Sequence, residues 1–147
     1  MTDKTLLEDS RRKLGAALEI LMASVDDYPG FNPEQAYSPK EREPFDALCD
    51  RYLRAFESSL RFFRTWERVY EATPSETFRD LLLRMAKLRL ISGVDVWLNM
   101  RDVRNRIAHE YQPHELSKIY QAIVGPAAEE MRFMLVAIDK KLENSIL

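Results

Sequence analysis

Glycine is scarce in this sequence: the 147 residues include only four glycines, and no Asn-Gly or Asp-Gly pair occurs. Two-residue β-hairpins depend on such pairs, because their turns need residues that accept positive φ angles. Apolar residues recur instead at spacings of three and four, which places them along one face of an α-helix. The sequence therefore predicts an all-α fold, an up-and-down helical bundle of about five helices.

Five stretches of the chain have this helical periodicity and are bounded by residues that start or stop helices. The second stretch is the longest and carries seven of the 15 aromatic side chains, which we expect in the core. Because 46% of the residues are hydrophobic, residues 1–147 are expected to form one domain with one core. The predicted helices cover residues 6–25, 44–72, 75–88 and 93–109, with a fifth stretch over 113–142 that Gly125-Pro126 interrupts.

A long connection is expected between the first two helices. Residues 29–44 hold four of the seven prolines, which disfavour helix in most positions. Phe31 and Tyr37 lie within this segment and favour a loop that packs down onto the core.

Capping residues mark the starts of the later helices. Thr73 or Ser75 is the expected cap of the third helix. Ser92 and Asp95 have the spacing of a capping box at the start of the fourth. Pro113 suits the first turn of the fifth stretch, where an amide hydrogen is not needed.

Charge is balanced over the whole chain but not along it. Lys and Arg number 22 against 24 Asp and Glu, a net charge of -2, which excludes a uniformly basic nucleic-acid-binding surface and a disordered acidic tail. Residues 79–109 nevertheless carry seven positive and three negative side chains, a local net of +4. Such a patch raises the local concentration of an anionic ligand, with a solvated arginine-rich helix face as the alternative. Arg101 and Arg106 belong to this patch and are candidate residues for binding an anionic ligand such as RNA.

Metal, disulfide and membrane functions find little support. Cys49 is the only cysteine, and the two histidines lack HExxH or CxxC spacing, so we expect no disulfide, no metal and no cofactor. No run approaches the ~18 to 20 apolar residues that span a bilayer, and the first residues do not resemble a signal peptide. We expect a cytoplasmic protein without membrane contact.

Residues suited to catalysis are concentrated in 101–111. His109 can transfer protons near neutral pH, and the planar fork of Arg104 matches a phosphate. Together they are the minimum set for metal-free phosphodiester cleavage. On a helix Asn105 and His109 lie one turn apart, whereas Arg104 and His109 differ by about 140°. Because one chain offers a single well-placed histidine, a two-fold dimer is needed to bring two together.

A structural interpretation of the same residues stays open. A histidine in the last turn of a helix often interacts with the free carbonyl groups there. Asp102 and Arg106 have the i,i+4 spacing of a surface ion pair. In that case Arg104 and His109 make surface contacts and no chemistry.

The segment from Arg104 to Tyr111, Arg-Asn-Arg-Ile-Ala-His-Glu-Tyr, resembles the motif of the HEPN superfamily, in which arginine, four residues, histidine, any residue and tyrosine follow one another. It is most similar to the HepT-like toxins encoded beside minimal nucleotidyltransferase (MNT) antitoxins. The layout agrees, since the motif lies on the penultimate helix before a proline-interrupted final helix. Residues 29–44 are longer than the first connection typical of these toxins.

The resemblance implies a metal-independent endoribonuclease that acts on RNA as a homodimer, with the motifs of two chains facing each other across a cleft. Arg104 and His109 would be catalytic, and Asn105 would orient the pair or the phosphate. Tyr111 matches the tyrosine that the MNT partner modifies with adenylyl groups, which silences the nuclease. The superfamily also includes noncatalytic substrate-binding or docking companions of nucleotidyltransferases, and this is the alternative function.

Overall fold

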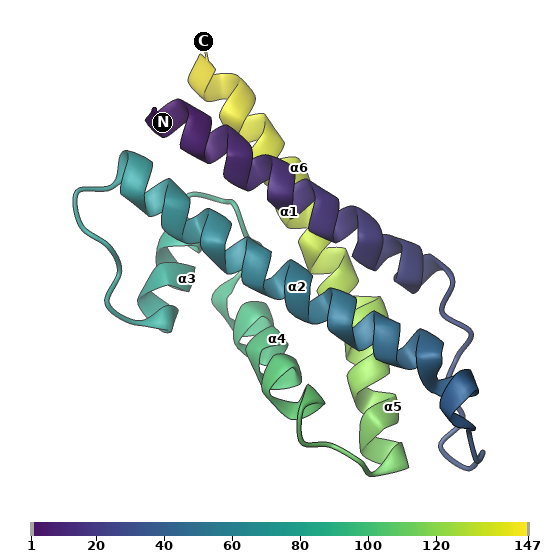
Figure 1. Cartoon of the computed structure of the whole chain (residues 1–147). Helices are drawn as coiled ribbons and strands as arrows, with labels where there is room; N and C mark the ends of the chain where they lie inside the picture. The colour runs from purple at the N-terminus through teal and green to yellow at the C-terminus, as the bar shows by residue number, and fades with distance from the viewer. Residues whose placement is uncertain (1, 147) are drawn as a thin grey trace.

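The computed structural model describes residues 2–146, and every regular element within them is helical, which confirms the all-α prediction (Figure 1). Because α5, η1 and α6 follow one another without a gap, the described chain forms five helical stretches. No helix in this part of the chain is both long and apolar enough to cross a bilayer. The elements are α1 (Asp3–Asp26), α2 (Pro39–Tyr70), α3 (Phe78–Lys87), α4 (Val94–Ile107), α5 (Pro113–Ala122), the π-helical turn η1 (Ile123–Ala127) and α6 (Ala128–Ile146).

Helices α1 and α2 form a long antiparallel pair that spans the molecule (Figure 1). The stripe of leucine side chains along one face of α1 is buried in the core that α1 shares with α2 and α6. Helix α6 crosses behind α1, and the Arg11 side chain joins the two by donating to Asp139 at 2.6 Å. The buried stripe consists of Leu7, Leu14, Leu18 and Leu21.

The aromatic side of α2 forms the centre of the core, as its periodicity predicts. Phe56 stacks on Trp97 of α4 with ring centroids 5.9 Å apart, and Phe63 meets the same indole edge-on at 5.2 Å. All three side chains are fully buried. These contacts hold α4 against the middle of α2. They thereby fix the position of the Arg104–Tyr111 motif, which begins in the last turn of α4.

The predicted start of α2 was wrong, because the helix begins at Pro39 and contains Pro44. Ser38 and Glu41 form a complete capping box: the Glu41 amide donates to Ser38 Oγ at 3.2 Å, and the Ser38 amide donates to Glu41 Oε1 at 3.0 Å. Pro44 lies early in the helix and removes only the bond that its own amide would make to exposed Lys40. The capping box outweighs that loss.

The shortened loop packs onto the core, as its aromatic residues predict. Phe31 stacks on Tyr37 with centroids 5.0 Å apart and meets Phe45 edge-on at 5.1 Å. The Asn32 amide donates to the Tyr37 hydroxyl at 2.9 Å. The proline-rich segment is thus an ordered part of the fold.

The predicted cap of α3 was also wrong. Thr77 is the cap, and its hydroxyl accepts a hydrogen bond from the Asp80 amide at 3.0 Å. The Ser75 amide and hydroxyl donate instead to the buried carboxylate of Glu67. A buried carboxylate is stable only when several hydrogen-bond donors surround it. Ser75 therefore donates to Glu67 and does not cap α3.

The predicted capping box of α4 was wrong for the same reason, because a second buried carboxylate takes the donors of Ser92. Ser92 does not bond Asp95; its hydroxyl and its amide (3.0 Å) donate to the buried Glu130 of α6. The indole nitrogen of Trp97 donates to the same carboxylate at 2.8 Å. Helix α4 therefore starts at Val94, with Gly93 before it and no side-chain cap, and Glu130 joins its first turn to α6.

Gly125-Pro126 does not break the last helical stretch. It lies in η1, a π-helical turn that joins α5 to α6. Proline removes one amide donor, and a wider turn accommodates the resulting gap in the bonding pattern.

Candidate functional site

The motif segment begins in the last turn of α4 and continues into a short link to α5. Helix α4 ends at Ile107, two residues before the predicted end at His109. The amides of His109 and Glu110 both donate to the Arg106 carbonyl, at 3.1 and 3.0 Å. The Glu110 carboxylate then accepts hydrogen bonds from the next two amides along the chain, at 3.1 and 2.9 Å. These bonds hold the link in a defined conformation.

Arg104 is anchored on α2 by a ring and a carboxylate. Its guanidinium lies over the Phe56 ring, 5.3 Å from the centroid, and its Nη1 donates to Glu57 Oε1 at 2.5 Å. Its Nε donates to Asn105 Oδ1 at 3.2 Å. With 31% of the Arg104 side chain exposed, the group is positioned by the protein and still accessible. The structure therefore brings Arg104 and Asn105 together and adds Glu57 to them.

Glu57 was missed in the sequence, where it lies 47 residues before Arg104. It has no motif around it, and only the packing of α4 on α2 shows the contact. The same packing is reinforced by Tyr52, whose hydroxyl donates to the Met100 carbonyl at 2.5 Å. Burial raises the pKa of Tyr52 despite the opposing charge of Arg104, so this hydroxyl remains a donor.

His109 and Tyr111 lie on the exposed link after α4. Tyr111 is 82% exposed, the highest value among the large hydrophobic side chains described. The His109 side chain is exposed and makes no hydrogen bond or ion pair within the described residues. Both groups are therefore accessible to a substrate, a second copy of the chain or a modifying enzyme.

Arg101 and Arg106 have different surroundings. The Arg101 guanidinium lies 4.8 Å from the centroid of Phe78 and has no acidic partner within the described residues. Arg106 does not pair with Asp102 as its spacing predicts; it binds Glu115 on α5 and lies 3.9 Å from Glu110. The positive charge of Arg106 is thus shared between two carboxylates, and the Arg106–Glu115 ion pair joins α4 to α5.

A row of arginines on α2 was not recognised in the sequence either. Arg54, Arg61, Arg64 and Arg68 follow one another at spacings of seven, three and four, and therefore lie on one face of the helix. Glu57 belongs to the same face. The spacing of these arginines is visible in the sequence as a periodic charge pattern. Only the fold shows that the face of α2 that carries them lies next to Arg104.

No three His, Cys, Asp or Glu side chains cluster as metal ligands in the part of the chain that the structure describes.

Residues 17–138 match the family model described as "Nucleotidyltransferase substrate binding protein like". No significant match was found among curated proteins. The family match covers all of α2 to α5, including Glu57, Arg104 and His109. This all-helical chain therefore belongs to the nucleotidyltransferase substrate binding protein-like family.

Proposed function

We propose that this protein is the endoribonuclease toxin of a toxin-antitoxin pair and that it cleaves RNA without a metal ion. The observation that carries the proposal is the arrangement of Arg104 beside Asn105 and Glu57, with the exposed His109 four residues after Asn105 in the chain. The sequence resemblance to HepT-like toxins supports the same assignment. The whole chain acts as one domain in this proposal.

The chemistry requires a proton-transfer group and a fixed positive charge. His109 removes the proton of the RNA 2′-hydroxyl or protonates the leaving 5′-oxygen. Arg104 stabilises the charge that develops on the phosphorane-like transition state. Because each chain has one suitable histidine, the active unit is a homodimer with two motifs facing one cleft.

The partner in this proposal is a minimal nucleotidyltransferase antitoxin. The family description, "Nucleotidyltransferase substrate binding protein like", supports a partner of this class. Tyr111 is the modification site, and its exposed hydroxyl is open to adenylyl transfer. An adenylate two residues from His109 blocks RNA sterically and repels its phosphates.

The first test is incubation of the purified protein with RNA in the presence of a chelator. Cleavage by the wild type and its loss in both His109→Ala and Arg104→Ala are expected, while light scattering reports a dimer for all three. Equal cleavage by His109→Ala contradicts the proposal. Mixing with the nucleotidyltransferase and ATP is expected to label the wild type and not Tyr111→Phe.

A second candidate function is a noncatalytic companion that binds a nucleotidyltransferase or its substrate. It is favoured by the family description and by Glu57, which occupies part of the Arg104 fork. In that case the wild type leaves RNA intact in every buffer, yet forms a stable complex with the nucleotidyltransferase. Retention of that complex by His109→Ala separates docking from catalysis.

A further inference from the structure

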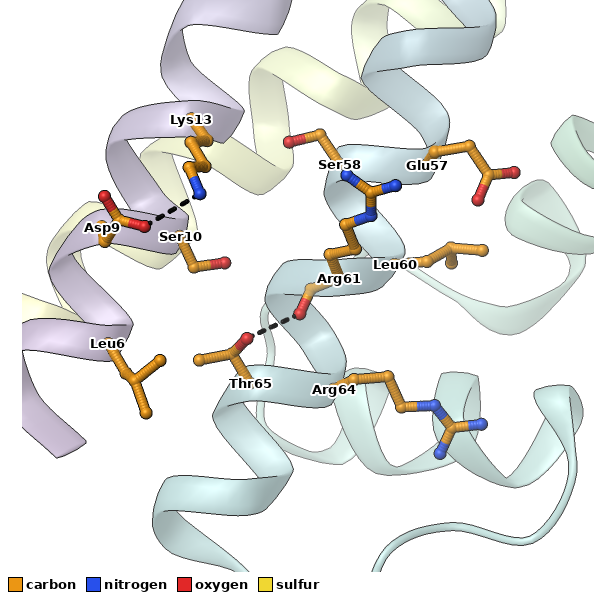
Figure 2. Close-up of a pocket in the computed structure, with 10 residues that line it drawn as sticks. All are labelled: Leu6, Asp9, Ser10, Lys13, Glu57, Ser58, Leu60, Arg61, Arg64 and Thr65. Carbon is orange, nitrogen blue, oxygen red and sulfur yellow. Dashed lines mark hydrogen bonds and ion pairs between the residues drawn. The ribbon is translucent and has the colours of Figure 1, made fainter. Parts of the chain in front are cut away.

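Two adjoining cavities form a groove between α1 and α2, which we call the α1/α2 groove. Their volumes are about 470 and 510 Å³, and Glu57 and Arg61 line both of them. Figure 2 shows the first cavity, with Lys13 and Ser10 on the α1 wall and Arg61 on the α2 wall. The groove therefore runs along the face of α2 that carries the arginine row.

The charge of this groove is opposite to that of the whole chain. Its two cavities are lined by five cationic and two acidic side chains, whereas the chain has a net charge of -2. A concave surface of one sign concentrates ligands of the opposite sign. The cationic residues are Lys13, Arg51, Arg54, Arg61 and Arg64, and the acidic residues are Asp9 and Glu57.

Both acidic groups of the groove already have cationic partners. Asp9 binds Arg12 and lies 3.1 Å from Lys13, while Glu57 binds Arg104. The cationic partners therefore reduce the electrostatic repulsion between each carboxylate and an anionic ligand.

Two of the groove cations have no acidic partner. Within the described residues, the Arg61 guanidinium takes part in no ion pair or hydrogen bond; only its backbone carbonyl is engaged, by the Thr65 hydroxyl at 2.9 Å. Arg51 donates only to neutral groups, the Ser24 hydroxyl at 2.7 Å and the Ile20 carbonyl at 3.4 Å. Their positive charges remain available to a ligand.

Glu57 connects this groove to the candidate site. It lines both cavities and also holds Arg104 at 2.5 Å. Arg61 lies one turn further along α2, about 6 Å along the helix axis. An extended anionic chain that contacts Arg104 can therefore continue into the groove without leaving the α2 surface.

We propose that the α1/α2 groove binds the phosphodiester backbone of single-stranded RNA next to the cleaved bond, with Arg61 and Arg51 contacting phosphates. This rests on the proposed ribonuclease function and extends it from two catalytic residues to a substrate path. Arginine suits this role because its fork binds phosphate oxygens bidentately. Contacts of this kind position RNA and do not read its sequence.

The test measures binding of a short fluorescein-labelled single-stranded RNA by fluorescence anisotropy at several salt concentrations. All variants carry His109→Ala so that the RNA stays intact. Arg61→Gln is expected to raise Kd about fivefold, the effect of one exposed charge contact, and to lower the slope of log Kd against log salt by about 0.7. Adding Arg51→Gln is expected to raise Kd a further fivefold or so, because the two arginines lie at separate positions.

The matched control is Arg42→Gln, an exposed arginine of the same helix that lies outside both cavities. Its Kd is expected to match that of the His109→Ala parent. Unchanged RNA affinity in Arg61→Gln overturns the groove assignment even if wild-type cleavage supports the ribonuclease. A change in oligomeric mass or in nucleotidyltransferase binding, with RNA affinity unchanged, also overturns it and identifies a protein interface. Absence of both RNA binding and wild-type cleavage instead rejects the proposed function itself.

Discussion

Replacement of Glu57 by alanine tests whether this carboxylate positions Arg104. The side chains of Arg104 and Glu57 are 31% and 46% exposed, and their atoms approach to 2.5 Å. For a partly exposed pair with one charge-assisted hydrogen bond, a contribution of about 1 kcal/mol is reasonable. If that energy orders Arg104 for the transition state, its loss lowers kcat about fivefold.

Separate measurement of kcat and KM for RNA cleavage distinguishes positioning from charge repulsion. Glu57→Ala also removes a negative charge near the RNA, so KM is expected to stay constant or fall while kcat falls. Glu57→Gln keeps an acceptor oxygen for Arg104 and is expected to recover most of the lost kcat. The matched control is Asp50→Ala, which removes an acid from an exposed i,i+4 pair with Arg54 on the same helix.

An increase of kcat in Glu57→Ala refutes this reasoning. It means that the carboxylate competes with phosphate for Arg104. Equal losses of kcat in Glu57→Ala and Asp50→Ala refute it in another way, because a general effect of α2 charge then explains both.

Three further predictions concern stability and reactivity. Glu130→Ala is expected to cost about 3 kcal/mol of unfolding free energy in urea, because Trp97 Nε1 and a backbone amide lose their buried acceptor; a loss below about 0.5 kcal/mol contradicts the role assigned to this carboxylate. The pKa of Glu67 is lower than that of a free glutamate. Burial by itself would raise it, but the hydrogen bonds from Ser75 and Arg64 outweigh this effect. Its contribution to stability is therefore present at neutral pH and lost as pH falls through that lowered pKa, so Glu67→Gln is expected to lose less stability than the wild type between about pH 7 and pH 3. Burial raises the pKa of Cys49 to about 12, so its thiol is expected to react with a disulfide reagent far more slowly in the native state than in urea, and equal rates argue against that burial.

The helices themselves were predictable because their signals are local. Leu14, Leu18 and Leu21 repeat at the period of a helix, and their burial follows wherever a second helix covers them. The start of α2 was predictable too, since Ser38 and Glu41 have capping-box spacing before the first turn. The prolines around it favoured a loop instead, and the predicted start near Pro44 was wrong.

The partners of the polar side chains depended on the tertiary structure. Ser92 had a plausible local partner in Asp95, but the buried Glu130 of another helix needed its donors more. Arg106 likewise turned from Asp102 to Glu115, because packing of α5 brought a second carboxylate within reach. Such choices depend on which groups from distant segments the packing brings together, and spacing along the chain does not encode that.

The same division applies to the candidate site. The sequence alone located Arg104, Asn105 and His109 in one motif near the end of a helix, because a motif eight residues long needs no tertiary information, but the helix ends at Ile107 and His109 lies on the link that follows. Only the packing of α4 on α2 set Arg104 against Phe56 and Glu57, and only the pairing of α1 with α2 gathered the arginines into a groove. Periodicity determines which face of a helix is buried, whereas contacts between distant segments determine which charges meet.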